Sequence, residues 1–353
     1  MFHSRNLAIF ASTKVSACTH IQGVWALKNE ERGGYLCGIL PFFYIETMAI
    51  EIKLATTTEE QIKRLRDRGM TIDNEPFATE TLLDIGYYRL GFYWFPLEKK
   101  YPKRDDRDHL FKKDAKFETA VHLYEFDKAF RNLLSSYLLD IEVNVRTKVI
   151  YHISNLHKNN PIWFADNKIV MSTYISQFES KYKYEVANND VIKRHAARHI
   201  NDKYAPAWKT LEYLSFGDLI RLIENLKNRD TKMMIYNCYG FNEDRTFPNY
   251  IEIVRSLRNT CAHGHPIFDL VLPKSIRASK FKKELKGNTL PNNFYSSMQG
   301  ALLVIQYLLY YLPNNRGDEF REKMKKFFHE KITADIRPMV GYLNTIPWLS
   351  QKI

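Results

Sequence analysis

The chain has 353 residues, which suggests about two domains, and its 45% hydrophobic and 26% charged residues are typical of a globular protein. Gly (14) and Pro (13) are too rare for a low-complexity chain, and no apolar run approaches the ~20 residues that a membrane-spanning helix needs. The 52 Lys and Arg outnumber the 40 Asp and Glu, and the net charge of +12 attracts polyanions, nucleic acid before an anionic membrane. Four scattered cysteines exclude a disulfide framework and favour the cytoplasm as the compartment.

Residues 1–47 differ in character from the rest of the chain. They hold two of the four cysteines, Cys18 and Cys37, and show no sustained hydrophobic period. The apolar stretch after Arg5 is too short for a signal peptide. At Met48 the sequence changes to a charged, helix-forming pattern. We therefore expect residues 1–47 to be an atypical N-terminal extension, and we hypothesise that the true start is Met48.

Residues 48–115 are expected to form an N-terminal helical region. Thr56/Glu59 and Thr57/Glu60 form two overlapping capping boxes, and the helix that they begin is expected to end at Gly69. A second helix opens at 73–76, an aromatic stretch follows at 87–96, and the polar stretch 98–116 is expected to be a surface loop.

Residues 116–353 are expected to form a helical bundle. Apolar residues recur at threes and fours from 117 to 156, which predicts a long bundle helix or a helix with a break. Pro248 stands at a plausible first helical position of a later helix. Further helical patterns cover 174–187, 190–202, 207–228 (interrupted near Gly217), 231–239, 247–263, 293–312 and 317–331. The predicted fold class is therefore all-α.

Common catalytic motifs are absent from the sequence. There is no Gly-rich phosphate loop, no dinucleotide fingerprint, no GxSxG elbow, no HExxH and no CxxC pair. His195 and His199 share a helix face, as a metal pair would, but Lys193, Arg194 and Arg198 around them oppose a metal ion. We expect a solvated basic face there, with nucleic-acid contact as an extra role, and we expect neither a metal nor another cofactor.

One constellation could carry chemistry, Arg258-Asn259-Thr260-Cys261-Ala262-His263. In a helix, Asn259 and His263 share a face and the long side chain of Arg258 can reach over. An imidazole can take a proton from a ribose 2′-hydroxyl, and a guanidinium can stabilise the charge on a phosphate in the transition state. These are the groups that metal-independent RNA cleavage needs. One histidine cannot easily be both base and acid, so a symmetric partner would supply the second.

The spacing alone is a weak signal. Arginine followed by histidine at a similar distance also occurs at Arg104/His109, Arg146/His152, Arg194/His199 and Arg258/His265. A structural histidine that bonds the last carbonyls of a helix is the alternative interpretation of His263.

The surrounding residues strengthen the signal, because the chain resembles the Abi-like family of bacterial abortive-infection proteins, which carry a HEPN domain. The resemblance runs from about Thr57 to Ser279. The residues that carry it follow one another in the order of the family's motifs: 58–70, the aromatic stretch 86–96, 123–131, 141–147, Pro206-Ala207-Trp208 with Leu214-Ser215-Phe216-Gly217, and 257–263.

The resemblance implies a HEPN-type helical bundle and a metal-independent endoribonuclease that works as a homodimer. It gives Arg258 and His263 the catalytic roles and makes Asn259 the polar residue that follows the arginine. Glu142 and Arg146 would brace the site from a neighbouring helix, and a plain ion pair within their own helix is the alternative. After His263 the chain departs from the family, since the arginine of its usual run is missing and His265 stands nearby.

Basic residues after the motif suggest where RNA would run. We expect RNA contacts from Lys274, Arg277, Lys280, Lys282 and Lys283, although such a run is also typical of a solvated face. The aromatic stretch from Tyr87 to Phe95 could stack bases, but core packing is favoured.

Three functions follow from these observations. The first is a toxin-like HEPN ribonuclease in phage defence, restrained by an antidote such as a cognate non-coding RNA. The second is a non-catalytic RNA-binding module that holds a small or guide-like RNA. The third, a membrane-associated or protein-interaction factor, rests on the positive charge and the helical surfaces alone.

Overall fold

The computed structural model describes residues 18–21, 24–29, 34–35, 54–277 and 290–345. The chain divides into two compact units, Met1–Ala55 and Thr56–Ile353. In the first, β1 (Cys18–Ile21), β2 (Val24–Asn29) and β3 (Gly34–Tyr35) form an antiparallel sheet in the order β1-β2-β3, with Cys18 opposite Leu27 and Lys28 opposite Tyr35. Met48, the hypothesised start, lies outside the described residues.

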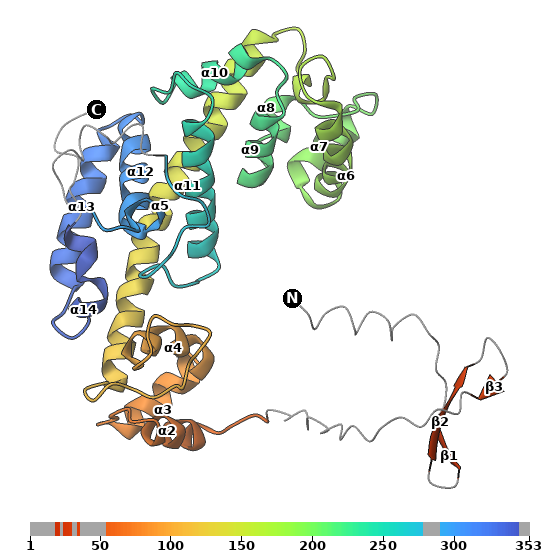
Figure 1. The fold of residues 1–353 in the computed structure, drawn as a ribbon. Helices are drawn as coiled ribbons and strands as arrows, with labels where there is room; N and C mark the ends of the chain where they lie inside the picture. Colours follow the sequence, from red (N-terminus) through yellow and green to blue (C-terminus); the bar gives the residue numbers. More distant parts are fainter. Residues whose placement is uncertain (1–17, 22–23, 30–33, 36–53, 278–289, 346–353) are drawn as a thin grey trace. The chain divides into compact units, whose positions relative to one another are not determined.

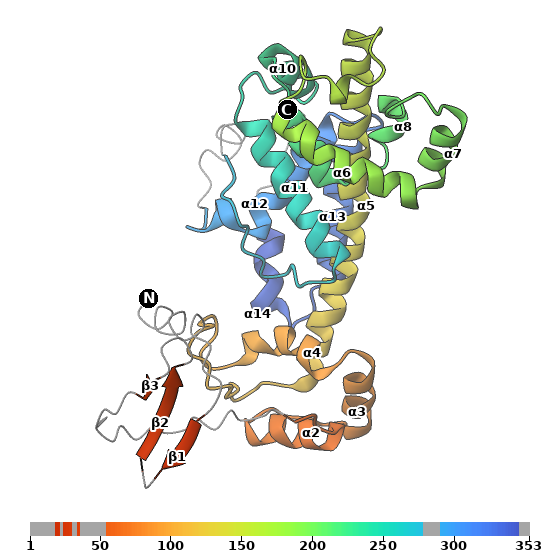
Figure 2. The same cartoon turned by 90° about the vertical axis from the view of Figure 1, so that its right-hand side faces the viewer.

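The second unit is built from helices, and this confirms the all-α fold (Figures 1 and 2). Four isolated β-bridges are the only extended pairing in its described residues. In chain order the α-helices are α2 (Thr58–Asp67), α3 (Glu75–Asp84), α4 (Tyr87–Trp94), α5 (Phe117–Leu156), α6 (Ser172–Asn188), α7 (Asp190–Arg198), α8 (Ala207–Thr210), α9 (Phe216–Glu224), α10 (Arg229–Asn237), α11 (Thr246–Ala262), α12 (Met298–Tyr310), α13 (Arg316–Lys331) and α14 (Arg337–Val340). Short 3-10 turns are η1 (Phe95–Leu97), η2 (Trp163–Ala165), η4 (Phe294–Ser296) and η5 (Gly341–Thr345).

Side-chain caps begin the first helices where the sequence predicts them. Of the two overlapping capping boxes, Thr57/Glu60 forms, with Glu60 N–H donating to Thr57 Oγ1 at 3.3 Å and Thr57 N–H to Glu60 Oε2 at 2.9 Å. Asn74 caps α3 by accepting from the Phe77 amide at 3.0 Å. The stretch 98–116 contains no helix, as expected, although Glu98 within it is buried and paired with Arg107.

Helix α5 is the central element of the second unit. It runs unbroken over 40 residues, because the segment contains neither Gly nor Pro and its buried stripe never changes side. Leu134, Ile141, Val145 and Val149 are fully buried in that stripe. Helices α4, α10, α11, α12 and α13 all pack on α5. Figures 1 and 2 show α2–α4 at its N-terminal end and α10 near its C-terminal end.

The later helices follow the sequence pattern with shifted boundaries. The interruption expected near Gly217 is the gap between α8 and α9, where Ser215 caps α9 by accepting from the Asp218 amide. The expectation for Pro248 is wrong, since α11 begins at Thr246 and Pro248 is its third residue. The helix begins earlier because Glu243 accepts from the Thr246 amide at 2.9 Å. Within the described residues, no helix combines the length and the apolar character that crossing a membrane requires.

Candidate functional site

Helix α11 carries the candidate catalytic residues, and its buried face determines where they point. Tyr250, Val254, Leu257 and Cys261 recur at threes and fours and are buried against the core. The position after Leu257 is at the edge of this face, so Arg258 is half-exposed rather than buried or fully solvated.

Two arginines share the carboxylate of Glu142 on α5. Arg146 Nη2 donates to Glu142 Oε1 at 2.9 Å, and Arg258 Nε lies 3.2 Å from Glu142 Oε2 as an ion pair. Glu142 and Arg146 are buried, whereas the side chain of Arg258 is 42% exposed. Glu142 and Arg146 thus form an ion pair within α5. The same Glu142 carboxylate also contacts Arg258 on α11.

The other end of Arg146 ties this carboxylate to the segment before α9. Its Nη1 donates to the carbonyl oxygens of Leu211 at 2.5 Å and Leu214 at 2.8 Å. Arg258 Nη1 lies 3.4 Å from Asn259 Oδ1, a weak contact within the motif. The guanidinium of Arg258 is thus held on its inner side, and its outer side faces solvent.

His263 stands at the C-cap of α11, where the chain leaves the helix. Its amide donates to the Asn259 carbonyl at 2.9 Å. Gly264 follows with φ +68°, and the amides of Gly264 and His265 donate to the carbonyls of Cys261 and Thr260. This is a Schellman motif, which needs a left-handed residue after the cap and therefore favours glycine. The motif turns the chain sharply and leaves the His263 side chain exposed.

The structure brings Arg258 and Asn259 together but not His263. No hydrogen bond or ion pair within the described residues joins the His263 side chain to Arg258 or Asn259. Its neighbouring ring is that of the exposed His265, whose centroid lies 6.3 Å away. The three motif residues lie on one helix end, with the imidazole pointing to solvent.

Residues far away in sequence fix the segment after His263, and sequence reasoning missed these contacts. Arg89 Nη1 on α4 donates to the Gly264 carbonyl at 3.0 Å. Asp127 on α5 accepts from the amides of Ile267 at 3.1 Å and Phe268 at 2.8 Å. The Tyr93 hydroxyl donates to Asp127 at 2.9 Å. In the sequence, Arg89, Tyr93 and Asp127 stand in segments that are similar to the family's motifs. The resemblance did not say which residues they contact.

Burial has the largest effect on the pKa values of Asp127 and Cys261, which lie in the core next to the motif. It raises the pKa of Asp127 to about 6, against the ion pair with Arg131 and the hydrogen bonds from Tyr93 and two amides, which favour the carboxylate. Burial also raises the pKa of the Cys261 thiol to about 12, so Cys261 is no thiolate nucleophile at neutral pH. Cys261 packs against the core as a small hydrophobic residue.

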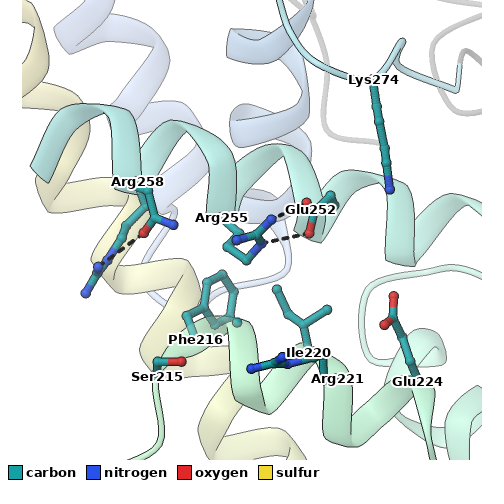
Figure 3. Close-up of a pocket in the computed structure, with 11 residues that line it drawn as sticks. Ser215, Phe216, Ile220, Arg221, Glu224, Glu252, Arg255, Arg258 and Lys274 are labelled. Carbon is teal, nitrogen blue, oxygen red and sulfur yellow. Dashed lines mark hydrogen bonds and ion pairs between the residues drawn. The ribbon is translucent and has the colours of Figure 1, made fainter. Parts of the chain in front are cut away.

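A cleft of about 530 Å³ lies between α9 and α11 and reaches the motif (Figure 3). Its basic side chains come from both helices and from the segment after α11. Ser215, Phe216 and Ile220 add a hydroxyl and apolar surface. Four cations line it: Arg221, Arg255, Arg258 and Lys274.

The acidic residues of the cleft neutralise only part of this charge. Glu252 pairs with Arg255, its Oε2 accepting from Nε at 2.8 Å, and Glu224 is the other acidic lining residue. Arg221 pairs with Asp218 at the start of α9. The cleft is therefore lined by four cations and two carboxylates, with Arg258 at the motif and Lys274 toward the opposite end (Figure 3).

The predicted RNA-contact residues divide into two groups. Lys274 lines the cleft, and Arg277 is exposed, while its backbone is held by Asn249 and Tyr250 at the start of α11. Lys280, Lys282 and Lys283 lie outside the described residues.

The aromatic stretch divides between core and surface. Tyr93, Trp94 and Phe95 are buried, as core packing requires, whereas Tyr88 and Phe92 are exposed and contact each other edge to face. Tyr87 is partly buried and contacts Trp94, so the most accessible rings for base stacking are those of the exposed pair.

Together, the fold and the site define an all-α protein with a polar motif at the end of a bundle helix, beside a positively charged cleft. A family model described as Abi-like protein matches residues 80–269, more than half of the chain. The chain belongs to this family. The matched span begins in α3, contains Arg258 and His263, and ends just after the segment that Asp127 anchors. Comparisons with curated proteins and with solved structures found no match.

Proposed function

We propose that the protein is a metal-independent endoribonuclease of the HEPN type that acts as a toxin-like effector in abortive infection. The observation that carries the proposal is the position of Arg258, half-exposed in the lining of a positively charged cleft and five residues before the exposed His263. Membership in the Abi-like family supports the defence role.

The chemistry assigned to these residues is an attack of a ribose 2′-hydroxyl on the adjacent phosphorus. A histidine removes the hydroxyl proton, the bond from phosphorus to the 5′-oxygen breaks, and the leaving oxygen gains a proton. Arg258 stabilises the charge on the phosphate, because its guanidinium is held by Glu142 from behind and open toward solvent. The products carry a 2′,3′-cyclic phosphate and a 5′-hydroxyl.

A homodimer would supply the second histidine. Leu139 and Val143 on α5 are about half exposed and four residues apart, so they share one helix face, and Tyr151 continues it two turns later. This face flanks Glu142, which contacts Arg258. A second copy seated on it would cover apolar surface and bring two motifs together.

Cleavage of RNA in the presence of EDTA by the purified full chain tests the proposal. We expect Arg258→Ala and His263→Ala each to lower the rate at least ~100-fold, the range typical of losing an acid–base group or a charge-stabilising donor. Arg64→Ala, which removes an exposed cation from α2, is the matched control and should cleave like the wild type. Cleavage that persists in both motif variants would refute the assignment.

The alternative is a non-catalytic RNA-binding module that holds a cognate non-coding RNA. The observation that favours it is the lack of a side-chain contact between His263 and Arg258 in the described residues of one chain. This module would bind RNA in a salt-sensitive manner and leave no cut ends, and Arg258→Ala and His263→Ala would still bind.

A further inference from the structure

A second basic cavity lies away from α11, between α7 and α8. It has a volume of about 210 Å³ and is lined by Val191, Arg194, His195, Arg198, His199 and Lys209. None of these lining residues is acidic. The volume is below the roughly 300–1,000 Å³ of small-molecule pockets, so the cavity suits a single charged group rather than a whole cofactor.

The cations of this cavity lack carboxylate partners. In the described part of the chain, the Arg194 side chain donates a hydrogen bond only to the Asp190 carbonyl. There, the Arg198 side chain forms no hydrogen bond or ion pair, and Lys209 Nζ forms its one polar contact with His195. Arg221 and Arg255 in the cleft near the motif differ, since each is paired with a carboxylate. The α7–α8 cavity therefore has positive charge that the protein itself does not neutralise.

A buried histidine orders the cavity from within. The side chain of His195 is only 5% exposed, and its ring stacks on His199 with centroids 4.5 Å apart. Lys209 Nζ lies 3.4 Å from His195 Nδ1, and since an ammonium only donates, Nδ1 is the acceptor. His195 Nε2 then carries the proton and lies 3.4 Å from Asp202, which is half-exposed. His195 thus holds Lys209 in place. Burial, together with His199 and Lys209, lowers the pKa of His195 against the opposing effect of Asp202.

This arrangement corrects the expectation for His195. His195 is not part of a solvated face, although Arg194, Arg198 and His199 are exposed as predicted. Among the described residues, no cluster of His, Cys, Asp and Glu suited to a metal ion occurs.

The cavity is connected to the candidate site through a short series of contacts. Lys209 is two residues before Leu211, whose carbonyl accepts from Arg146, and Arg146 shares Glu142 with Arg258.

We propose that the α7–α8 cavity binds a backbone phosphate of the RNA, as a second anchor separate from the residues that cleave it. The inference rests on the proposed function for its ligand, an RNA chain, but not on catalysis. Arg194 and Arg198 provide the charge-assisted hydrogen bonds, and Lys209 provides a fixed point charge.

The test measures binding of a labelled single-stranded RNA to the full chain carrying His263→Ala, so that cleavage does not interfere. We expect Arg194→Ala/Arg198→Ala to weaken binding by about tenfold to a hundredfold, as the loss of one or two charge-assisted hydrogen bonds implies. The slope of log K against log salt should become shallower by about 0.7 for each phosphate that the variant no longer neutralises. The control, Lys63→Ala/Arg64→Ala, removes two exposed cations from α2 and should bind normally.

Three other outcomes would change this conclusion. Affinity equal to that of the control would overturn the proposal and leave the cations as complements to the C-terminal dipole of α7. Thermal stabilisation by inorganic phosphate that is lost in the variant, without a change in RNA affinity, would assign the cavity to free phosphate and also overturn it. If wild-type protein binds RNA at this cavity but cuts none, only the proposed cleavage fails.

Discussion

Glu142 is the residue on which the candidate site depends most. It is buried, and its two oxygens face two guanidiniums, one buried and one half-exposed. Since Arg146 is also bonded to two carbonyls, it cannot move away if Glu142 is lost. The Glu142–Arg146 ion pair therefore does not only stabilise α5. It also fixes the carboxylate that positions Arg258.

We expect Glu142→Gln to destabilise the protein by about 3 kcal/mol, because it leaves the buried Arg146 without its countercharge. Glu125→Gln is the control, since Glu125 lies on the same helix, is exposed and forms an exposed ion pair with Lys128. Its effect should be within ~0.5 kcal/mol. Urea unfolding measures both, and equal losses would contradict the central role of Glu142.

Asp218 gives a prediction for pH. Burial raises its pKa, but hydrogen bonds from Lys181, Ser215 and Arg221 outweigh burial, so the pKa lies below the ordinary value of 3.8. A folded-state pKa below the unfolded one contributes stability that is present above the unfolded value and lost as pH falls through the folded value.

The difference in melting temperature between wild type and Asp218→Asn should therefore be large at pH 6 and shrink as pH falls toward 3. Melting curves across this range, followed by circular dichroism, measure it. A difference that stays constant over the whole range would show that the charge of Asp218 does not stabilise the fold.

At the scale of single elements, the turn after α11 decides where His263 points. Gly264 adopts φ +68°, and a Cβ at this position would lie 3.2 Å from Arg89 Nη1. We expect Gly264→Ala to cost about 1–2 kcal/mol, the cost of a left-handed conformation for a residue with a side chain. RNA cleavage should fall more than stability alone explains, because the Schellman motif places the histidine.

Gly91→Ala is the matched control, and it should raise the stability of the protein where Gly264→Ala lowers it. Gly91 is in helix α4, and an added Cβ would meet Trp94 at an ordinary 3.8 Å. Alanine in a helix interior is favoured over glycine by roughly 0.5–1 kcal/mol. Thermal unfolding and cleavage assays on both variants check the pair, and a neutral Gly264→Ala would contradict the role of the turn.

Local sequence features, such as helix caps and helix-breaking residues, predicted the helices better than they predicted the contacts between helices. The capping box at Thr57 and the missing breakers in 117–156 are local features, so the sequence indicates α2 and α5 directly. The strands between Cys18 and Tyr35 were missed because β1 and β3 are only four and two residues long, and β2 does not alternate between apolar and polar residues.

The candidate site shows the same division. Arg258, Asn259 and His263 are close in sequence, so helical geometry alone predicts that they share one helix end. Arg89 and Asp127 reach the segment after His263 across 175 and 141 residues, and only tertiary packing brings them there. The resemblance marked their segments but assigned neither residue a partner.

At the scale of the whole molecule, the proposed chemistry uses two copies of the chain, because one histidine cannot easily be both base and acid. The exposed face of α5 with Leu139, Val143 and Tyr151 is apolar and adjoins the residues that hold Arg258. Covering it in a symmetric dimer removes apolar surface from water and raises the positive potential around a shared RNA.

We therefore expect the wild type to be a dimer and Leu139→Arg/Val143→Arg to be a monomer, because two charges on each copy would meet their own counterparts across a two-fold axis. RNA cleavage should fall at least ~100-fold in this monomer, as in His263→Ala, since the second histidine is then missing. Binding of RNA by each chain should persist, because Arg194, Arg198 and Lys274 are unchanged. Leu83→Arg is the control, as Leu83 is 75% exposed on α3, away from α5. Light scattering gives the mass and the cleavage assay gives the activity.

A monomeric wild type that cleaves RNA at full rate would exclude the shared site and require both proton transfers from a single chain.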